Sequence, residues 1–167
     1  INNLLRLNKS KKDLAIVAHT AETENKTGLG DVVNQFYGGF CVKLIPSSNF
    51  IVKNISMSKT DVYCRYFSKI LTSSIITNQK LKDKITQAGI IGLNKIKKLI
   101  NGKAKIKFGD IIKISKDFAI ASNILKNRKT IKTINEIGKK RGNASMIMLG
   151  NAVFSDKPFH NSIKLKI

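Results

Sequence analysis

The residues that could carry out chemistry are concentrated in one stretch of the chain, between His19 and Lys43. His19 and Glu22 lie three residues apart, so a helix would place them on neighbouring faces. A second carboxylate, Asp31, follows a glycine-containing turn, and Lys43 follows a pair of glycines. Carboxylates can accept protons or bind Mg²⁺, and a cation can bind an anionic ligand. The stretch is therefore the candidate site.

Each of these residues also has a purely structural interpretation. Asp is a favoured N-cap, and the local pattern around Asp31 favours a cap over a catalytic role. A capping carboxylate nevertheless stays ionised, as a proton acceptor for a hydroxyl group must. Glu22 could be a solvated helix residue, and His19 a hydrogen-bonded core imidazole. The alternation of a strand favours a solvent-facing side chain for Lys43.

Two helices and a hairpin are expected to position these groups. Ser10 is a good N-cap for a helix over residues 11–25. A second helix is expected to begin at Asp31 and to end at Gly38 and Gly39. Two strands, over residues 40–45 and 50–55, would follow as a hairpin.

The rest of the chain predicts one more strand, a helical region and a return to strands. The third strand covers residues 62–67, and an apolar segment over 146–154 and a strand over 162–167 lie near the end. Five helices are expected between them, over residues 79–88, 90–100, 108–115, 117–126 and 130–140. The pattern predicts an α+β fold.

The composition is strongly basic, with 31 Lys and Arg residues against 10 Asp and Glu residues and a net charge of +21. Such a charge raises nucleic acid or an anionic membrane as a partner. The excess is almost entirely lysine, however, whereas nucleic-acid sites interleave arginine and aromatic residues with their lysines. Neither nucleic acid nor a membrane is therefore the expected partner, although a basic RNA-binding or ribosome-associated protein remains an alternative.

The sequence lacks the short motifs of several common catalytic, metal and phosphate-binding sites. The sequence contains no GxxxxGK[ST], HExxH, CxxC or GxSxG motif. Cys41 and Cys64 have no metal-ligand spacing, which is typical of reduced cysteines in a cytoplasmic protein. No apolar run approaches the length of a transmembrane helix.

The motifs HTAE, TGLGDV, YGGF with its following lysine, and ASMIMLGNAVF occur in an order that resembles the archaeal pantoate kinases. These enzymes are a branch of the GHMP kinase superfamily. The resemblance implies the downstream part of a two-domain GHMP kinase fold. Residues 1–58 would be the end of a first domain that resembles a ribosomal-protein domain (S5 domain 2-like). Residues 59–167 would form a helix-rich, ferredoxin-like second domain.

The resemblance also implies a role for each motif residue. Asp31 matches the catalytic aspartate and Glu22 the acid that helps to hold Mg²⁺. His19 matches a position that holds pantoate, and Lys43 falls where the family typically has an arginine that grips the substrate carboxylate. The loop and phosphate-binding positions are Thr27, Gly28, Gly30, Gly150 and Asn151.

The implied reaction is ATP-dependent phosphorylation of the primary hydroxyl of pantoate to 4-phosphopantoate, in coenzyme A biosynthesis. ATP and Mg²⁺ are the implied cofactors, and a homodimer is left open. Another GHMP kinase that acts on a different small alcohol is the alternative. The superfamily's glycine- and serine-rich ATP loop does not occur in the sequence. We therefore expect a fragment that lacks the N-terminal part, is inactive alone and binds ATP weakly or not at all.

Overall fold

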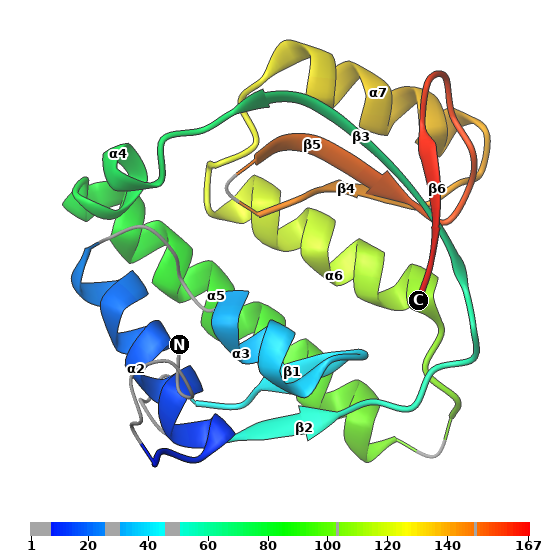
Figure 1. The fold of residues 1–167 in the computed structure, drawn as a ribbon. Helices are drawn as coiled ribbons and strands as arrows, with labels where there is room; N and C mark the ends of the chain where they lie inside the picture. The colour runs from blue at the N-terminus through cyan, green and yellow to red at the C-terminus, as the bar shows by residue number, and fades with distance from the viewer. Residues whose placement is uncertain (1–7, 26–30, 46–50, 103, 149) are drawn as a thin grey trace. The chain divides into compact units, whose positions relative to one another are not determined.

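The chain has an α+β fold, as the sequence predicts (Figure 1). The computed structural model describes residues 8–25, 31–45, 51–102, 104–148 and 150–167. The chain divides into two compact units, Ile1–Ser56 and Met57–Ile167.

The first unit opens with helix α2, Lys11–Glu24, whose start is fixed by a capping box. The Ser10 hydroxyl accepts a hydrogen bond from the Asp13 backbone N–H at 3.1 Å, and the Asp13 carboxylate accepts one from the Ser10 N–H at 3.1 Å. The Ser10 hydroxyl also donates to that carboxylate at 2.7 Å. The predicted cap at Ser10 is confirmed, and two backbone donors at the helix start are satisfied.

A short helix and a hairpin complete the first unit. Helix α3, Asp31–Tyr37, is followed by Gly38 and Gly39, both with φ near +60° (63° and 64°). This left-handed conformation favours glycine and ends the helix as predicted. Strands β1, Cys41–Lys43, and β2, Val52–Asn54, then pair antiparallel with Lys43 opposite Val52. The first strand is thus shorter than the predicted 40–45, and residue 50 of the second predicted strand, with the turn between them, lies outside the described residues.

The second unit is built on a four-stranded antiparallel sheet in the order β4-β5-β3-β6. The strands are β3 Asp61–Lys69, β4 Ala144–Met146, β5 Gly150–Ser155 and β6 Ile163–Lys166. Cys64 of β3 lies opposite Phe154 of β5, and Arg65 lies opposite Val153. Because side chains alternate along a strand, Cys64 and Arg65 point to opposite faces of the sheet.

Helices cover both faces of this sheet (Figure 1). Helix α6, Phe108–Ala121, packs on the Cys64 face, where Phe108 and Phe154 have ring centroids 6.3 Å apart. Helix α7, Arg128–Lys139, lies on the other side of the strands and buries Ile134 and Ile137. Helices α4, Thr72–Ile76, and α5, Gln79–Asn101, precede them, and α5 packs against α6.

The division of the helical region predicted from the sequence is wrong at three places. Residues 79–100 form one helix, α5, because Gly89 is accommodated inside it. Residues 108–121 likewise form one helix, α6, which ends at Ala121, before the predicted end at 126. Asn123 has a φ of 60°, which cannot continue an α-helix. Helix α4 was not predicted, since five residues give too short a pattern.

Candidate functional site

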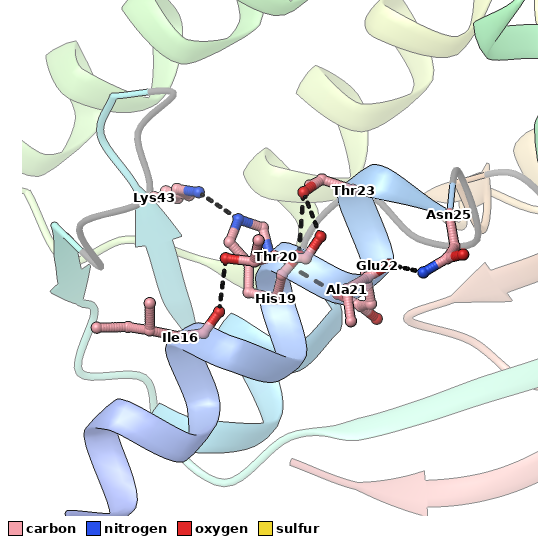
Figure 2. A network of polar contacts seen from close by, with 8 residues as sticks. All are labelled: Ile16, His19, Thr20, Ala21, Glu22, Thr23, Asn25 and Lys43. Atoms are coloured by element: carbon pink, nitrogen blue, oxygen red, sulfur yellow. Dashed lines mark hydrogen bonds and ion pairs between the residues drawn. The ribbon is translucent and has the colours of Figure 1, made fainter.

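His19 is the centre of a polar network in the first unit (Figure 2). Its residue surface is only 7% exposed, although it lies on a mostly exposed helix. Nε2 of His19 lies 3.4 Å from Nζ of Lys43, and Nδ1 lies 3.7 Å from Oε2 of Glu22. The structure therefore brings together three of the residues that the sequence singled out.

Lys43 is half-buried and reaches toward helix α2, which corrects the expectation that strand alternation would turn it to solvent. Burial lowers the pKa of its amine below the usual value. A three-residue strand carries too little alternation to define an outer face. Removing an amine from water without a hydrogen-bond partner costs free energy. The contact with His19 offsets part of that free energy.

The contact with Lys43 bears on the tautomer of the imidazole. An ammonium group has only donors, so Nε2 of His19 accepts in its contact with Lys43. The proton of a neutral imidazole then lies on Nδ1, facing the Glu22 carboxylate. The 3.7 Å separation exceeds a hydrogen bond, so this second contact is electrostatic. The Lys43 amine, the His19 ring and the Glu22 carboxylate thus lie in a row.

Threonine hydroxyls donate to backbone carbonyls of the helix turn that carries this network. Thr23 donates to the carbonyl oxygens of His19 at 3.2 Å and Thr20 at 2.8 Å, and Thr20 donates to that of Ile16 at 3.0 Å (Figure 2). Asn25 donates from its side chain to the Ala21 carbonyl at 2.8 Å. The sequence analysis missed these residues, although hydroxyl side chains in a helix commonly bond to the carbonyl four residues earlier.

Asp31 is exposed and is the first residue of helix α3. A carboxylate in the first turn is stabilised by the positive end of the helix dipole. Within the part of the chain that the structure describes, no hydrogen bond or ion pair joins Asp31 to His19, Glu22 or Lys43. The predicted loop residues Thr27, Gly28 and Gly30 lie outside the described residues.

Gly150 and Asn151 belong to the second unit and lie at the start of strand β5. The Asn151 side-chain amide donates to the Ser68 hydroxyl at 2.8 Å. Asn151 also lines a cavity of about 470 Å³ that includes Lys126 and the residues capping two helices, Asn78 and Asn127. The side chain of Asn78 accepts from the Leu81 N–H and that of Asn127 from the Thr130 N–H.

That cavity was not anticipated from the sequence, because its polar residues come from three separate segments. The sequence feature that could have pointed to it is the N-cap asparagine before each of helices α5 and α7. Helix starts carry partial positive charge, and Lys126 adds a full one. The cavity is therefore suited to an anionic group.

The family resemblance implies Mg²⁺, so the described side chains must include ligands that could hold this ion. In the described ranges, no three His, Cys, Asp or Glu side chains are grouped as a metal cage. Mg²⁺ rarely needs such a cage, because it is usually held by one or two carboxylates together with water and substrate phosphates. The Glu22 side chain, 20% exposed, fits that limited contribution. No helix in the described residues is long and apolar enough to cross a membrane.

The arrangement of elements is shared with a solved phosphotransferase. A protein described as a phosphotransferase related to the coenzyme A biosynthesis pathway superposes with a TM-score of 0.72 and 24% identity, over 88% of this chain and 46% of that chain. At this level of identity the similarity concerns the fold.

Sequence comparison identifies more closely related proteins. The chain is a homologue of the pantoate kinase of Methanocaldococcus jannaschii, with 32% identity over 156 residues, 92% of this chain and 53% of the relative. A pantoate kinase of Methanospirillum hungatei is 27% identical, over 93% of this chain and 49% of the relative. The chain thus spans about half the length of the curated relatives it matches. No protein-family model matches it. The predicted resemblance to archaeal pantoate kinases is confirmed.

Proposed function

We propose that this chain is part of a kinase that transfers a phosphoryl group from ATP to the primary hydroxyl of pantoate, giving 4-phosphopantoate for coenzyme A synthesis. The observation that carries the proposal is the network of Lys43, His19 and Glu22, formed by motif residues in a homologue of pantoate kinases. Phosphoryl transfer depends mainly on positioning and charge neutralisation, and this network offers both.

Lys43 and His19 are assigned to the pantoate carboxylate. The amine is half-buried beside a buried ring, so an anion that approached it would form a contact only partly screened by water. His19 holds the amine from one side and limits its freedom. The negative charge of a bound carboxylate would also offset the desolvation that lowers the pKa of Lys43.

Glu22 is assigned to Mg²⁺, with phosphate oxygens and water completing the shell. When bound, the ion would neutralise charge on the phosphates. His19 faces one oxygen of the Glu22 carboxylate and would orient it, as the outer-shell partners of metal ligands commonly do. The substrate site and the metal site would thereby be coupled through one imidazole.

Asp31 is assigned as the catalytic carboxylate, which accepts the proton of the pantoate hydroxyl or orients that hydroxyl for attack. Its exposure and its place in the first turn of α3 support an ionised group that a substrate can reach. Thr27, Gly28 and Gly30 are proposed as the loop that precedes it. Gly150 and Asn151 are proposed to act near the phosphates, and the polar cavity at Asn151 supports that role.

The family-level domain assignment belongs to the same proposal. Residues 1–58 would be the end of the catalytic domain and residues 59–167 the helix-rich second domain. The division of the structure at Ser56 and Met57 supports a boundary close to this position.

A related kinase that acts on a different small alcohol is the second candidate, and Lys43 favours it. The resemblance places an arginine here, and lysine makes a point contact where arginine makes a two-pronged one. A substrate panel for the full-length gene product separates the two candidates. Preference for pantoate supports the proposal, whereas preference for mevalonate or homoserine supports the alternative.

A further inference from the structure

A second, smaller cavity lies entirely in the second unit and shares no residue with the candidate site. Its volume is about 270 Å³, and it is formed by strand β3, the last turns of helix α7 and the segment between β5 and β6. Three cationic residues line it, Arg65, Lys140 and Lys157. Ile137 and Phe159 add an apolar wall.

Arg65 is held in a defined orientation at this cavity. Its Nη1 donates to the carbonyl oxygen of His160 at 3.0 Å, which uses one of the five N–H donors of a guanidinium. Its Cζ atom lies 5.1 Å from the centre of the Phe67 ring, a cation–π contact on the same strand. An arginine fixed in this way loses little side-chain entropy when it binds a ligand.

The charges around the cavity favour an anion. Glu136 is the acidic residue among its lining groups, and its carboxylate lies 3.9 Å from the exposed amine of Lys132. The C-terminal end of a helix carries partial negative charge, so the end of α7 at this cavity would repel an anion. Here the carbonyls of Ile137 and Gly138 already accept backbone hydrogen bonds from residues 140–142, so this opposition is reduced.

We propose that this cavity binds a small organic anion that carries both a phosphate or carboxylate group and a compact apolar part. The anionic group would contact Arg65 and the lysines, and the apolar part would pack against Ile137 and Phe159. Arginine suits phosphates and carboxylates because its planar fork matches their paired oxygens. The volume admits a small molecule and is below the usual range of drug-sized sites.

The test is an NMR titration of the ¹⁵N-labelled protein with phenyl phosphate, inorganic phosphate and benzyl alcohol. Phenyl phosphate is expected to give saturable shifts in residues 133–140 and 157–160, with a Kd below about 1 mM. Inorganic phosphate should bind at the same residues more weakly, and benzyl alcohol should give no saturable shifts there.

Variants separate this cavity from the general positive charge of the chain. Lys140→Ala should weaken phenyl phosphate binding about three- to tenfold, while Lys139→Ala, its neighbour outside the cavity, should leave it unchanged. Arg65→Lys keeps the charge and should still weaken binding, because the fork is lost. The proposal is overturned if phenyl phosphate causes no saturable shifts, or if Lys139→Ala and Lys140→Ala weaken binding equally.

Discussion

Nζ of Lys43 lies 3.4 Å from Nε2 of His19, a contact that joins strand β1 to helix α2 across 24 positions of the chain. It places a partly desolvated cation beside a buried imidazole that also faces Glu22. Burying charged groups in this way costs desolvation free energy, so the contact contributes little to the stability of the fold. Its value is therefore expected to lie in binding.

Replacement of Lys43 separates binding from stability. Lys43→Met removes a desolvated charge, so we expect the unfolding free energy at neutral pH to stay within about 1 kcal/mol or to rise slightly, while the KM for pantoate rises about tenfold or more. Lys43→Arg should keep or lower the KM. Chemical denaturation and steady-state kinetics measure the two effects, and an unchanged KM in Lys43→Met would contradict the assignment.

The lowered pKa of Lys43 also gives a pH signature. Between the folded pKa and the unfolded value of 10.5, the unfolded state holds more protons than the folded state. The unfolding free energy of the wild type therefore gains a contribution that rises with pH in that alkaline window. Comparison with Lys43→Met across the window isolates it, and a parallel pH dependence in both proteins would count against the buried amine.

Glu22→Gln tests the metal assignment, with Glu24→Gln as its matched control on the same helix. The first change removes a charge beside His19, and the second removes an exposed charge two residues on. We expect Glu22→Gln to raise the Mg²⁺ concentration for half-maximal activity about tenfold or more. Glu24→Gln should leave it unchanged, and equal effects of the two variants would argue against a metal ligand at Glu22.

Asp31→Asn tests the catalytic assignment. The carboxylate is exposed at the start of α3, so its loss should cost less than about 1 kcal/mol of stability. We expect kcat to fall about 100-fold or more, because the amide cannot accept the hydroxyl proton. Steady-state rates together with thermal unfolding decide the outcome. A variant with near wild-type kcat would show that Asp31 serves only the helix.

The capping box of α2 should add a small acid dependence to the stability of the protein, because the Asp13 carboxylate is exposed. Hydrogen bonds from the side chain and backbone of Ser10 lower the pKa of Asp13 below 3.8. A lowered carboxyl pKa contributes stability above the unfolded value that is lost as the pH falls through the folded value. Ser10→Ala should cost about 1 kcal/mol at neutral pH and weaken this acid dependence. Unfolding followed from pH 7 to pH 2 measures it, and an unaltered acid profile would contradict the coupling.

A second stability test concerns the carboxylate of Asp156, which accepts hydrogen bonds from the Asn143 backbone at 2.7 Å and from its side-chain amide at 2.6 Å. Asp156→Ala should lower the unfolding free energy by about 2–3 kcal/mol, because both bonds involve a charged acceptor. Asp83→Ala, on the exposed side of α5, is the control and should change it little. Equal losses of unfolding free energy in the two variants would show that the hydrogen bonds between Asp156 and Asn143 add no stability of their own.

Local signals predicted the elements that depend on neighbouring residues. Ser10 predicted the start of α2, and the glycine pair at Gly38 and Gly39 predicted the end of α3. The predicted break at residue 89 was wrong because a single glycine is tolerated inside a long helix. A Cβ atom there would meet the Phe118 ring at 3.9 Å, an ordinary contact, so the packing of α5 on α6 does not require glycine at this position.

The candidate site was predicted as a set of residues, and its contacts required the tertiary structure. The spacing of His19 and Glu22 was enough to place them together on a helix. The approach of Lys43 depends on how the hairpin packs, which strand alternation does not encode. The cavities at Asn151 and Arg65 depend on segments far apart in sequence, so no local motif announced them.

The most direct test of the account is the phosphoryl acceptor of the full-length gene product, measured as ADP formation with pantoate, mevalonate or homoserine in the presence of ATP and Mg²⁺. The proposed function predicts pantoate-dependent ADP formation, 4-phosphopantoate as the product, and loss of that activity in Asp31→Asn. Phosphorylation of mevalonate or homoserine in preference to pantoate would contradict it.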